Sequence, residues 1–288
     1  MEIGDEMKVL VTGVGGQLGY DVIKELERRK IDCIGADLKE FDITDYEAAY
    51  SFITAHKPEA VIHCSAYTAV DRAEDEPKLC HRVNALGTEN IAKICQGINA
   101  KMVYISTDYV FPGTGEEFYE ATSPTSPQNI YGQTKLEGEL SVKSILDKYF
   151  IVRISWVFGI NGTNFIKTML KLGKERSEIS VVADQIGSPT YTADLAPLLC
   201  DMVVTENYGT YHATNEGICS WAEFAEEIFK IAKIDCKVNH IKTEEYPTKA
   251  TRPKNSRMSK KSLDEAEFKR LPSWQDAVNR YNKEIFLR

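Results

Sequence analysis

The chain has 288 residues, of which 43% are hydrophobic and 27% are charged, and its formal net charge at pH 7 is −8. This composition is that of a soluble globular protein with one or two domains and a large core. The negative balance argues against a broad nucleic-acid surface, which needs clustered Lys and Arg, but it is compatible with a local basic pocket for one small anion.

Cysteine usage and the chain ends narrow the class of protein further. The seven cysteines form no C-x-x-C pair and several lie in apolar runs, which predicts reduced, mostly buried thiols of a cytoplasmic protein. The five histidines are scattered without ligand spacing, so the sequence predicts no metal site. No apolar run approaches the roughly 20 residues of a membrane span, and no signal peptide is evident. Residues 1–6 are predicted to be a short disordered extension.

Short apolar runs alternate with helix-like segments in the first two thirds of the chain. The apolar residues within each run are continuous, which is typical of parallel strands buried on both faces. Repeated strand–helix–strand units predict an α/β protein with a doubly wound parallel sheet, a Rossmann-type fold that binds ligands beyond the carboxyl ends of its strands. The predicted strands are residues 8–13, 32–37, 60–66, 101–107 and 150–155, and the predicted helices are residues 18–30, 46–57, 84–98 and 131–146.

Beyond Phe158 this alternation loosens, and we predict a smaller, discontinuous C-terminal lobe that binds the substrate. It contains amphipathic helices at residues 163–175 and 220–234, a basic segment at 248–263 and a closing helix at 273–286, whereas residues 209–215 read as a further strand. The predicted boundaries are 7–158 plus about 190–215 for the dinucleotide-binding domain, and about 159–189 plus 216–288 for the substrate lobe.

The first predicted strand leads into the turn TGVGGQLG, which opens a helix and places Gly13, Gly16 and Gly19 three residues apart. A tight turn, a close approach to a pyrophosphate and close helix packing each need a missing side chain. The N-terminus of the new helix offers unpaired N–H groups and a positive dipole to phosphates. The alternative is a glycine-rich turn without a ligand, but a strand before it and a helix after it favour dinucleotide binding.

Asp37 ends the second run, 18 residues beyond Gly19. An acidic residue at this place can hydrogen-bond the adenosine ribose, which favours NADH. Lys39 can instead face a 2′-phosphate, which favours NADPH, and Asp37 can equally be a plain turn residue. The sequence therefore leaves the choice between NADH and NADPH open.

The third run ends in small and polar residues at the predicted ligand edge. Ser65 and Ala66 are small enough for a cofactor to lie against the backbone, and Tyr67 and Thr68 follow directly. The alternative is an ordinary loop between a strand and a helix.

Tyr131 and Lys135 lie four residues apart in a predicted helix, so their side chains share one face. This helix follows the strand that ends in Thr107 and Asp108, next to the expected nicotinamide position. A ketone that accepts a hydride becomes an alkoxide and needs a proton, which Tyr131 can donate. A nearby ammonium lowers the pKa of such a phenol by stabilising the phenolate, and Thr107 can hydrogen-bond the same carbonyl oxygen. We therefore prefer a catalytic pair to two ordinary residues on a solvated helix face.

Several short segments occur in one order along most of the chain. They are TGVGGQLG, DITD, SAYTAVDRAE, STDYVFPG, YGQTK, ISWVFG and ATRPKNSRMS. In these segments the chain resembles the extended short-chain dehydrogenase/reductases and, within them, the dTDP-4-dehydrorhamnose reductases. The resemblance implies reduction of the 4-keto group of dTDP-4-dehydro-6-deoxy-L-mannose by NADPH or NADH, giving dTDP-L-rhamnose, a precursor of cell-envelope polysaccharide.

The resemblance also implies roles for individual residues. Tyr131 is the proton donor, Lys135 its partner, and Thr107 tunes the donor. The residues implied to line the cofactor, with the glycine turn, are Gly13, Gly16, Gln17, Leu18, Gly19, Asp37, Asp42, Ile43, Ala66, Tyr67, Thr68, Tyr131 and Lys135. The residues implied to meet the sugar nucleotide are Thr107, Asp108, Trp156 and Arg252.

Two of these substrate residues have competing interpretations. Trp156 is either a core residue or a ring that stacks on the substrate, and its place just past the fifth run favours stacking. Arg252 is either a ligand of the substrate diphosphate, which a guanidinium grips in bidentate fashion, or an exposed charge of the tail. The sequence does not decide between the two interpretations of Arg252.

Related activities remain as alternatives. The dehydratases of the superfamily place an acidic residue after the Thr-Asp pair, where this chain has Tyr109, so reduction is favoured. Another NDP-sugar reductase or epimerase is the nearest rival, and a non-catalytic subunit like the regulatory subunit of methionine adenosyltransferase is a more distant one. Some reductases of the family bind Mg²⁺ through glutamates at a dimer contact, but those positions have no match here. The sequence therefore does not support Mg²⁺ and leaves both a monomer and a homodimer open.

Overall fold

Parallel strands form the central sheet of the protein, for which a computed structural model describes residues 7–286. The strands of this sheet are β1 (Lys8–Thr12), β2 (Asp32–Ala36), β3 (Ala60–His63), β4 (Lys101–Thr107), β5 (Tyr149–Ile154) and β10 (Gly209–His212). Their order is β10-β5-β4-β3-β1-β2, and Leu10 of β1 lies opposite both Ile34 of β2 and Val61 of β3. The predicted doubly wound parallel sheet is confirmed. The predicted extension, residues 1–6, lies outside the described residues.

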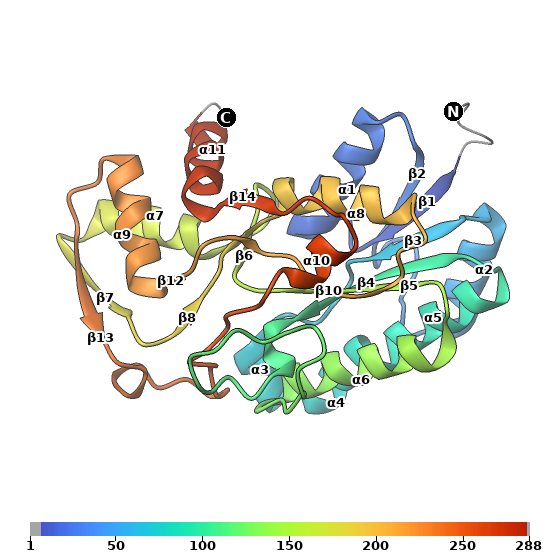
Figure 1. The fold of residues 1–288 in the computed structure, drawn as a ribbon, viewed down its shortest axis with the longest axis horizontal. Helices are drawn as coiled ribbons and strands as arrows, with labels where there is room; N and C mark the ends of the chain where they lie inside the picture. Colours follow the sequence, from blue (N-terminus) through green and yellow to red (C-terminus); the bar gives the residue numbers. More distant parts are fainter. Residues whose placement is uncertain (1–6, 287–288) are drawn as a thin grey trace.

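Helices cover both faces of this sheet (Figure 1). One face carries α1 (Gln17–Arg28) and α8 (Thr192–Val203), and the other carries α2 (Tyr46–His56), α5 (Thr88–Gly97) and α6 (Ile130–Ile145). Side chains alternate between the faces of a strand, so Val9 and Val11 join the core under α1 and α8 while Leu10 joins the opposite core. Burial on both faces explains why the strand sequences are continuously apolar.

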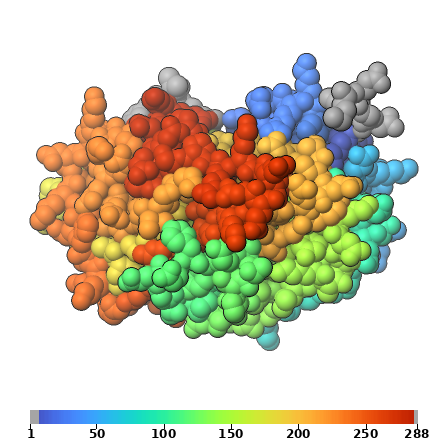
Figure 2. Space-filling model, viewed as in Figure 1, coloured from blue at the N-terminus to red at the C-terminus, as the bar shows by residue number. Residues whose placement is uncertain are grey.

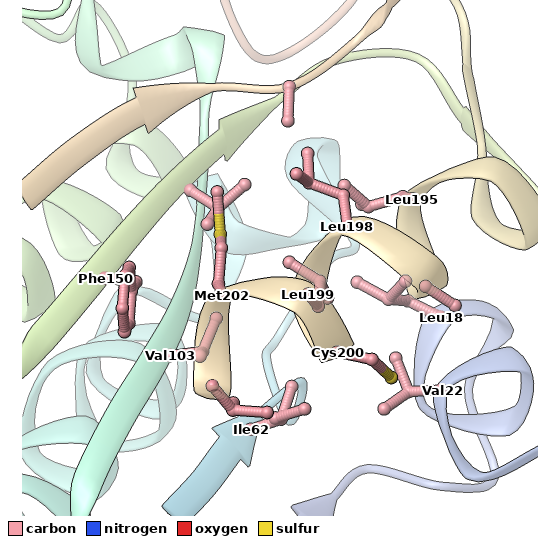
Figure 3. Close-up of a cluster of buried hydrophobic side chains, with 14 of the residues drawn as sticks. Leu18, Val22, Ile62, Val103, Phe150, Leu195, Leu198, Leu199, Cys200 and Met202 are labelled. Atoms are coloured by element: carbon pink, nitrogen blue, oxygen red, sulfur yellow. The ribbon is translucent and has the colours of Figure 1, made fainter. Parts of the chain in front are cut away.

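Helix α8 was not predicted from the sequence. It is apolar almost all round and contains Pro197, a residue that argues against a helix interior. Figure 3 shows Leu195, Leu198, Leu199 and Met202 of this helix together with side chains of α1 and of the sheet. The helix therefore exists because it is buried against the sheet and α1, and not because its sequence has an amphipathic period.

The segment between β3 and α5 is more broken than predicted. It forms α3 (Val70–Asp75), α4 (Pro77–His81) and a π-helix (Arg82–Gly87) before α5 begins at Thr88. The single predicted helix at residues 84–98 is therefore wrong in its first turn. π-Helical turns occur often at functional sites, and this one packs against α6.

Beyond β5 the chain builds a second region from helices and two-stranded ladders. Helices α7 (Phe165–Glu175), α9 (Trp221–Ala232) and α11 (Trp274–Phe286) share a separate hydrophobic core, and all three were predicted. The ladders pair β6 (Val157–Phe158) with β9 (Thr190–Tyr191), β7 (Glu178–Val182) with β13 (Lys237–Ile241), β8 (Ile186–Gly187) with β12 (Cys219–Ser220), and β11 (Asn215–Glu216) with β14 (Leu271–Ser273). The proposed division into two lobes follows this change in architecture, and its boundaries stay a prediction.

The segment after β13 returns from this second region to the Rossmann sheet. Asn255 N–H donates to the Gly113 carbonyl, and Tyr119 pairs with Arg257 and Ser259 through backbone hydrogen bonds. In Figure 2 this red-orange segment, with the short helix α10 (Lys261–Glu265), lies across the middle of the visible face next to green residues of the central part of the chain. Between residues 7 and 286, none of the helices has the length and apolar character needed to cross a membrane.

Candidate active site

A cavity of about 1250 Å³ opens at the carboxyl ends of β1, β3 and β4. The chain winds in opposite directions from β1 and β3, so this is the switch point of the sheet, where ligands of such folds bind. The predicted cofactor and catalytic residues all line this cavity, together with most of the predicted substrate residues. They are Gly13, Gly16, Gln17, Leu18, Gly19, Asp37, Asp42, Ile43, Ala66, Tyr67, Thr68, Thr107, Asp108, Tyr131, Lys135 and Trp156.

The glycine turn leaves its backbone open to this cavity. Gly13 has φ +71°, and a Cβ there would lie 2.8 Å from the Ser65 backbone nitrogen. A Cβ on Gly19 would collide with the Gly13 carbonyl, so side chains are excluded at both positions. Helix α1 begins at Gln17, and no side chain caps its N-terminus. The first N–H groups of the helix are thus available for an anion such as a pyrophosphate.

The Gln17 side chain supports the glycine turn from behind. Its Oε1 accepts hydrogen bonds from Gly159 N (2.9 Å) and Asn164 Nδ2 (3.0 Å), and Asn161 Nδ2 donates to the Gly15 carbonyl at 2.8 Å. The loop after β6 therefore fixes the glycine turn.

Asp37 lies at the end of β2, at the mouth of the cavity. Its Oδ2 accepts a hydrogen bond from Gly15 N at 2.8 Å, which joins it to the glycine turn. Lys39 is exposed and does not line the cavity. The position suits a carboxylate that accepts from a ribose hydroxyl. Next to it, Asp42 Oδ1 accepts from Thr44 N at 2.8 Å, and Ile43 is buried against Gly87.

Asn84 holds the loop after β3, and sequence reasoning missed it. This residue of the π-helix is 1% exposed. Its side chain accepts from Tyr67 N at 2.8 Å and donates to the Tyr67 carbonyl at 3.1 Å, and it also reaches Thr134 Oγ1 at 3.2 Å. Asn84 thus joins the cofactor-side loop to the helix that carries Tyr131, and no local pattern around it signals this contact.

Tyr131 lies in the first turn of α6 and points into the cavity. Asn129 caps the helix by accepting from Gly132 N at 2.8 Å. The Tyr131 ring packs edge-on against Tyr109, with ring centroids 5.4 Å apart. Burial raises the pKa of Tyr131 well above its ordinary value, against the opposing effect of a hydrogen bond with Thr107. The hydroxyl therefore keeps its proton until a strong base is present.

Lys135 lies one helical turn beyond Tyr131 and is only 2% exposed. Burial lowers the pKa of Lys135 to about 7, while the negative charge of Glu139 acts in the opposite direction. The ammonium lies over the Tyr104 ring, 4.1 Å from its centroid. A lysine that titrates near neutral pH inside a cavity is typical of a functional site.

Thr107 and Asp108 face Tyr131 from the end of β4. Thr107 Oγ1 donates to Asp108 Oδ1 at 2.9 Å, and Ser256 Oγ donates to Asp108 Oδ2 at 2.5 Å. Burial raises the pKa of Asp108 to about 6, despite these two donors. Ser256 belongs to the returning C-terminal segment, and sequence reasoning did not assign it a role.

A second cavity of about 980 Å³ adjoins the first, and Tyr109 and Trp156 line both. Trp156 has φ +50°, a strained conformation for a bulky residue and one that clusters at functional sites. Its indole stacks on Trp221 with ring centroids 3.8 Å apart. Trp156 is partly buried at the junction of the two cavities and packs against the core of the second region, so its stacking on the substrate stays a prediction.

Arg252 lines the second cavity. Its Nη1 donates to the Tyr109 hydroxyl at 2.8 Å, and its Nη2 donates to Asp71 Oδ2 at 2.6 Å. The side chain is 25% exposed and is held by these two partners, and its role as a diphosphate ligand stays a prediction. Its guanidinium stands beside the phenol that packs on Tyr131.

Metal ligands are not grouped in the part of the chain that the structure describes. Within residues 7–286, no three His, Cys, Asp or Glu side chains are arranged to hold a metal ion. All seven cysteines are free thiols, and burial raises the pKa of Cys64, which lines the first cavity, to about 12.

A doubly wound parallel sheet with a glycine turn at its switch point is the architecture of a dinucleotide-binding enzyme, and it agrees with the resemblance to the extended short-chain dehydrogenase/reductases. A family model described as the RmlD substrate binding domain matches residues 7–286. The chain belongs to this family, and it is an oxidoreductase. The family expected from the sequence is confirmed.

Known relatives match over nearly the whole chain. The spore coat polysaccharide biosynthesis protein SpsK of Bacillus subtilis is 38% identical, and the match covers 96% of this chain and 97% of that protein. A dTDP-4-dehydrorhamnose reductase of Aggregatibacter actinomycetemcomitans is also 38% identical, with coverage of 94% and 97%. The crystal structure of a dTDP-4-dehydrorhamnose reductase from Bacillus anthracis in complex with NADP is 46% identical, with a TM-score of 0.94 and coverage of 97% and 99%.

Proposed function

We propose that this protein reduces the 4-keto group of dTDP-4-dehydro-6-deoxy-L-mannose to the alcohol of dTDP-L-rhamnose. The observation that carries the proposal is that the half-buried Tyr131 and the buried Lys135 line the first cavity from one face of α6. Tyr131 also packs on Tyr109, which lines both cavities. The similarity to dTDP-4-dehydrorhamnose reductases supplies the substrate class.

A reduced nicotinamide, when bound in the first cavity, supplies the hydride. The glycine turn and the N-terminus of α1 suit its pyrophosphate, and Asp37 suits its adenosine ribose. The proposal covers both NADPH and NADH, because Asp37 favours NADH whereas the Bacillus anthracis relative was solved with NADP.

Tyr131 donates the proton that completes the alcohol. A ketone oxygen becomes strongly basic only as the hydride arrives, so a phenol that keeps its proton until then is a suitable acid. Lys135 stabilises the negative charge that remains on the phenolate, and it takes this role best when it is charged. Thr107 and Asp108 orient the donor, and Trp156 and Arg252 face the sugar and the diphosphate, respectively.

A substrate panel with each reduced cofactor tests the activity itself. We expect stoichiometric loss of nicotinamide absorbance with the dTDP-linked 4-ketosugar. Product formation without cofactor consumption would instead support an epimerase. Tight cofactor binding without turnover of any NDP-sugar would support a non-catalytic subunit.

Tyr131→Phe tests the assigned donor. Loss of a positioned acid typically lowers rates by about 10²–10⁴-fold, so we expect turnover to fall at least about a hundredfold while cofactor affinity changes less than about twofold. Tyr50→Phe is the matched control, because Tyr50 lies on α2 and is 44% exposed. Unchanged turnover in Tyr131→Phe would remove this residue from the mechanism.

A further inference from the structure

The side chain of Asn129 links the N-terminus of α6 to the segment that carries Arg252. Its Oδ1 accepts a hydrogen bond from Gly132 N at 2.8 Å, and its Nδ2 donates to the Thr251 carbonyl at 2.9 Å. Asn129 is 9% exposed. Gly132 directly follows Tyr131, and Thr251 directly precedes Arg252. One buried side chain therefore joins the backbone beside the proposed proton donor to the backbone beside the proposed diphosphate ligand.

Both partners of Asn129 are backbone groups, so the direction of each hydrogen bond is fixed. Gly132 N only donates and the Thr251 carbonyl only accepts, which assigns the oxygen and the nitrogen of the side-chain amide. Aspartate caps a helix about as well as asparagine does. An ionised aspartate has no proton to donate, however, and would place an oxygen against the carbonyl. The amide nitrogen therefore serves the connection to Thr251 and is not needed for the helix cap.

Helix α3 connects the same two segments by an indirect route. Asp71 Oδ1 accepts from Ala250 N at 3.1 Å, and Glu74 Oε1 accepts from Ile130 N at 2.9 Å. Helix α3, the first turn of α6 and residues 250–252 thus form a closed ring of hydrogen bonds. The Asp71 side chain is 43% exposed, so water competes with this route more than with the contact of the buried Asn129. The direct connection is therefore the firmer of the two.

We propose that Asn129 is a positioning residue for the reduction, because it fixes the segment that binds the substrate diphosphate through Arg252 to the helix turn that carries Tyr131. This inference rests on the proposed function. The proposed substrate carries its diphosphate on C1 of the sugar and its ketone at C4, on opposite sides of the ring. It must therefore meet both protein groups at once, and a fixed separation between them places the ketone oxygen at the phenol.

Breaking this connection should leave binding intact and slow the chemistry. Arg252 keeps its guanidinium and Tyr131 keeps its hydroxyl when Asn129 is changed, so each group can still meet the substrate. Their fixed relation is lost, and a displacement of about 1 Å between reacting groups can lower a rate by about 10²-fold. The effect should therefore appear in kcat and not in KM.

The test compares the turnover of the dTDP-linked 4-ketosugar in the wild type, Asn129→Asp and Gln128→Glu. Asn129→Asp keeps the acceptor for Gly132 N but removes the donor to Thr251. Gln128→Glu adds the same charge one residue earlier, at an exposed position that lines neither cavity. We expect kcat to fall at least about tenfold in Asn129→Asp, whereas the KM values for the sugar and the reduced cofactor change less than about twofold. Gln128→Glu should match the wild type.

An unchanged kcat in Asn129→Asp overturns the inference, and so does a fall in kcat with an equal rise in both KM values, which would indicate general damage to the site.

A second comparison tests the connection to Arg252 directly. In an Arg252→Ala background the diphosphate has lost its anchor, so Asn129→Asp should lower kcat by less than about threefold. The same fall in both backgrounds would show that Asn129 acts on α6 alone and would overturn the proposed connection. A wild type that reduces no ketosugar would refute the proposed function itself, whereas an active wild type with independent losses would refute only the role of Asn129.

Discussion

Lys135 places an amine where water barely reaches, and this has a cost in stability. Burial lowers the pKa of Lys135 to about 7, whereas an unfolded lysine keeps its ordinary value near 10.5. Between these two values the unfolded chain binds more protons than the folded one, so the free energy of unfolding rises with pH. The reduction in unfolding free energy caused by burying the charged amine is fully present below pH 7, and it becomes smaller as the pH rises from about 7 toward 10.5.

Replacing this lysine should therefore stabilise the protein at neutral pH. We expect Lys135→Met to be more stable than the wild type near pH 7, with an advantage that shrinks by about 1 kcal/mol for each pH unit above it. Urea unfolding of the ligand-free proteins at several pH values measures this difference. Lys93→Met removes an exposed lysine of α5 and should keep the wild-type dependence. An advantage that is constant with pH would show that Lys135 is charged throughout.

At the scale of elements, a buried ion pair fixes α6 on the sheet. Arg153 of β5 binds Glu139 of α6 in bidentate fashion at 2.8 and 2.7 Å, and both side chains are at most 2% exposed. Ser106 of β4 also donates to Glu139, and Arg153 reaches the Ala121 carbonyl in the loop before α6. The helix that carries Tyr131 and Lys135 is thus attached to two strands and to its own preceding loop through one charged pair.

Breaking one partner of this pair should cost far more than removing both. Arg153→Met leaves the Glu139 carboxylate buried without its partner, which typically costs about 3–5 kcal/mol of unfolding free energy. The double variant Arg153→Met/Glu139→Gln should recover most of that loss, because no buried charge remains. Denaturant unfolding of the two single variants and the double variant measures the coupling. If the losses of unfolding free energy in the two single variants add up to the loss in the double variant, Arg153 and Glu139 are not energetically coupled.

The elements also show what sequence patterns can predict. The strands of the central sheet and helices α1, α2, α6, α7, α9 and α11 were predicted to within a few residues, since their apolar patterns reflect the faces that each one buries, whereas the strands of the two-stranded ladders were not predicted. Helix α8 was missed because burial on every side removes the amphipathic period. The π-helix was missed because its extra residue per turn leaves no signature in the spacing of apolar residues.

At the scale of the whole molecule, the site is completed by residues from the last part of the chain. Tyr131 and Lys135 were predictable because four residues of helix fix their relation, and the glycine turn because it directly follows a strand. Ser256 and Arg252 meet Asp108 and Tyr109 only through the return of the C-terminal segment, about 150 residues later. Contacts across that distance depend on tertiary packing, so the sequence left Arg252 undecided and gave Ser256 no individual role.

Arg252 lines the second cavity but not the first, so its effect on substrate binding can be measured separately from any effect on cofactor binding. In the ligand-free protein the Arg252 guanidinium binds Asp71 and the Tyr109 hydroxyl. A substrate diphosphate in the second cavity would replace Asp71 as the partner of this guanidinium. A lost charge-assisted hydrogen bond is worth about 1.5–3 kcal/mol, so Arg252→Ala should raise the KM for the dTDP-ketosugar at least about tenfold. Because Arg252 does not line the cofactor cavity, the KM for the reduced nicotinamide should change less than about twofold.

Lys254→Ala is the control for this experiment, since Lys254 pairs with Asp184 and Glu244 and lines neither cavity. It removes the same unit of charge from the same segment, so a general loss of positive potential would raise the substrate KM in both variants. A rise in the substrate KM that is confined to Arg252→Ala would show that a specific guanidinium contact binds the diphosphate. Added salt should then also weaken substrate binding to the wild type. Equal effects in the two variants, or a matching rise in the KM for the cofactor, would remove Arg252 from the substrate site.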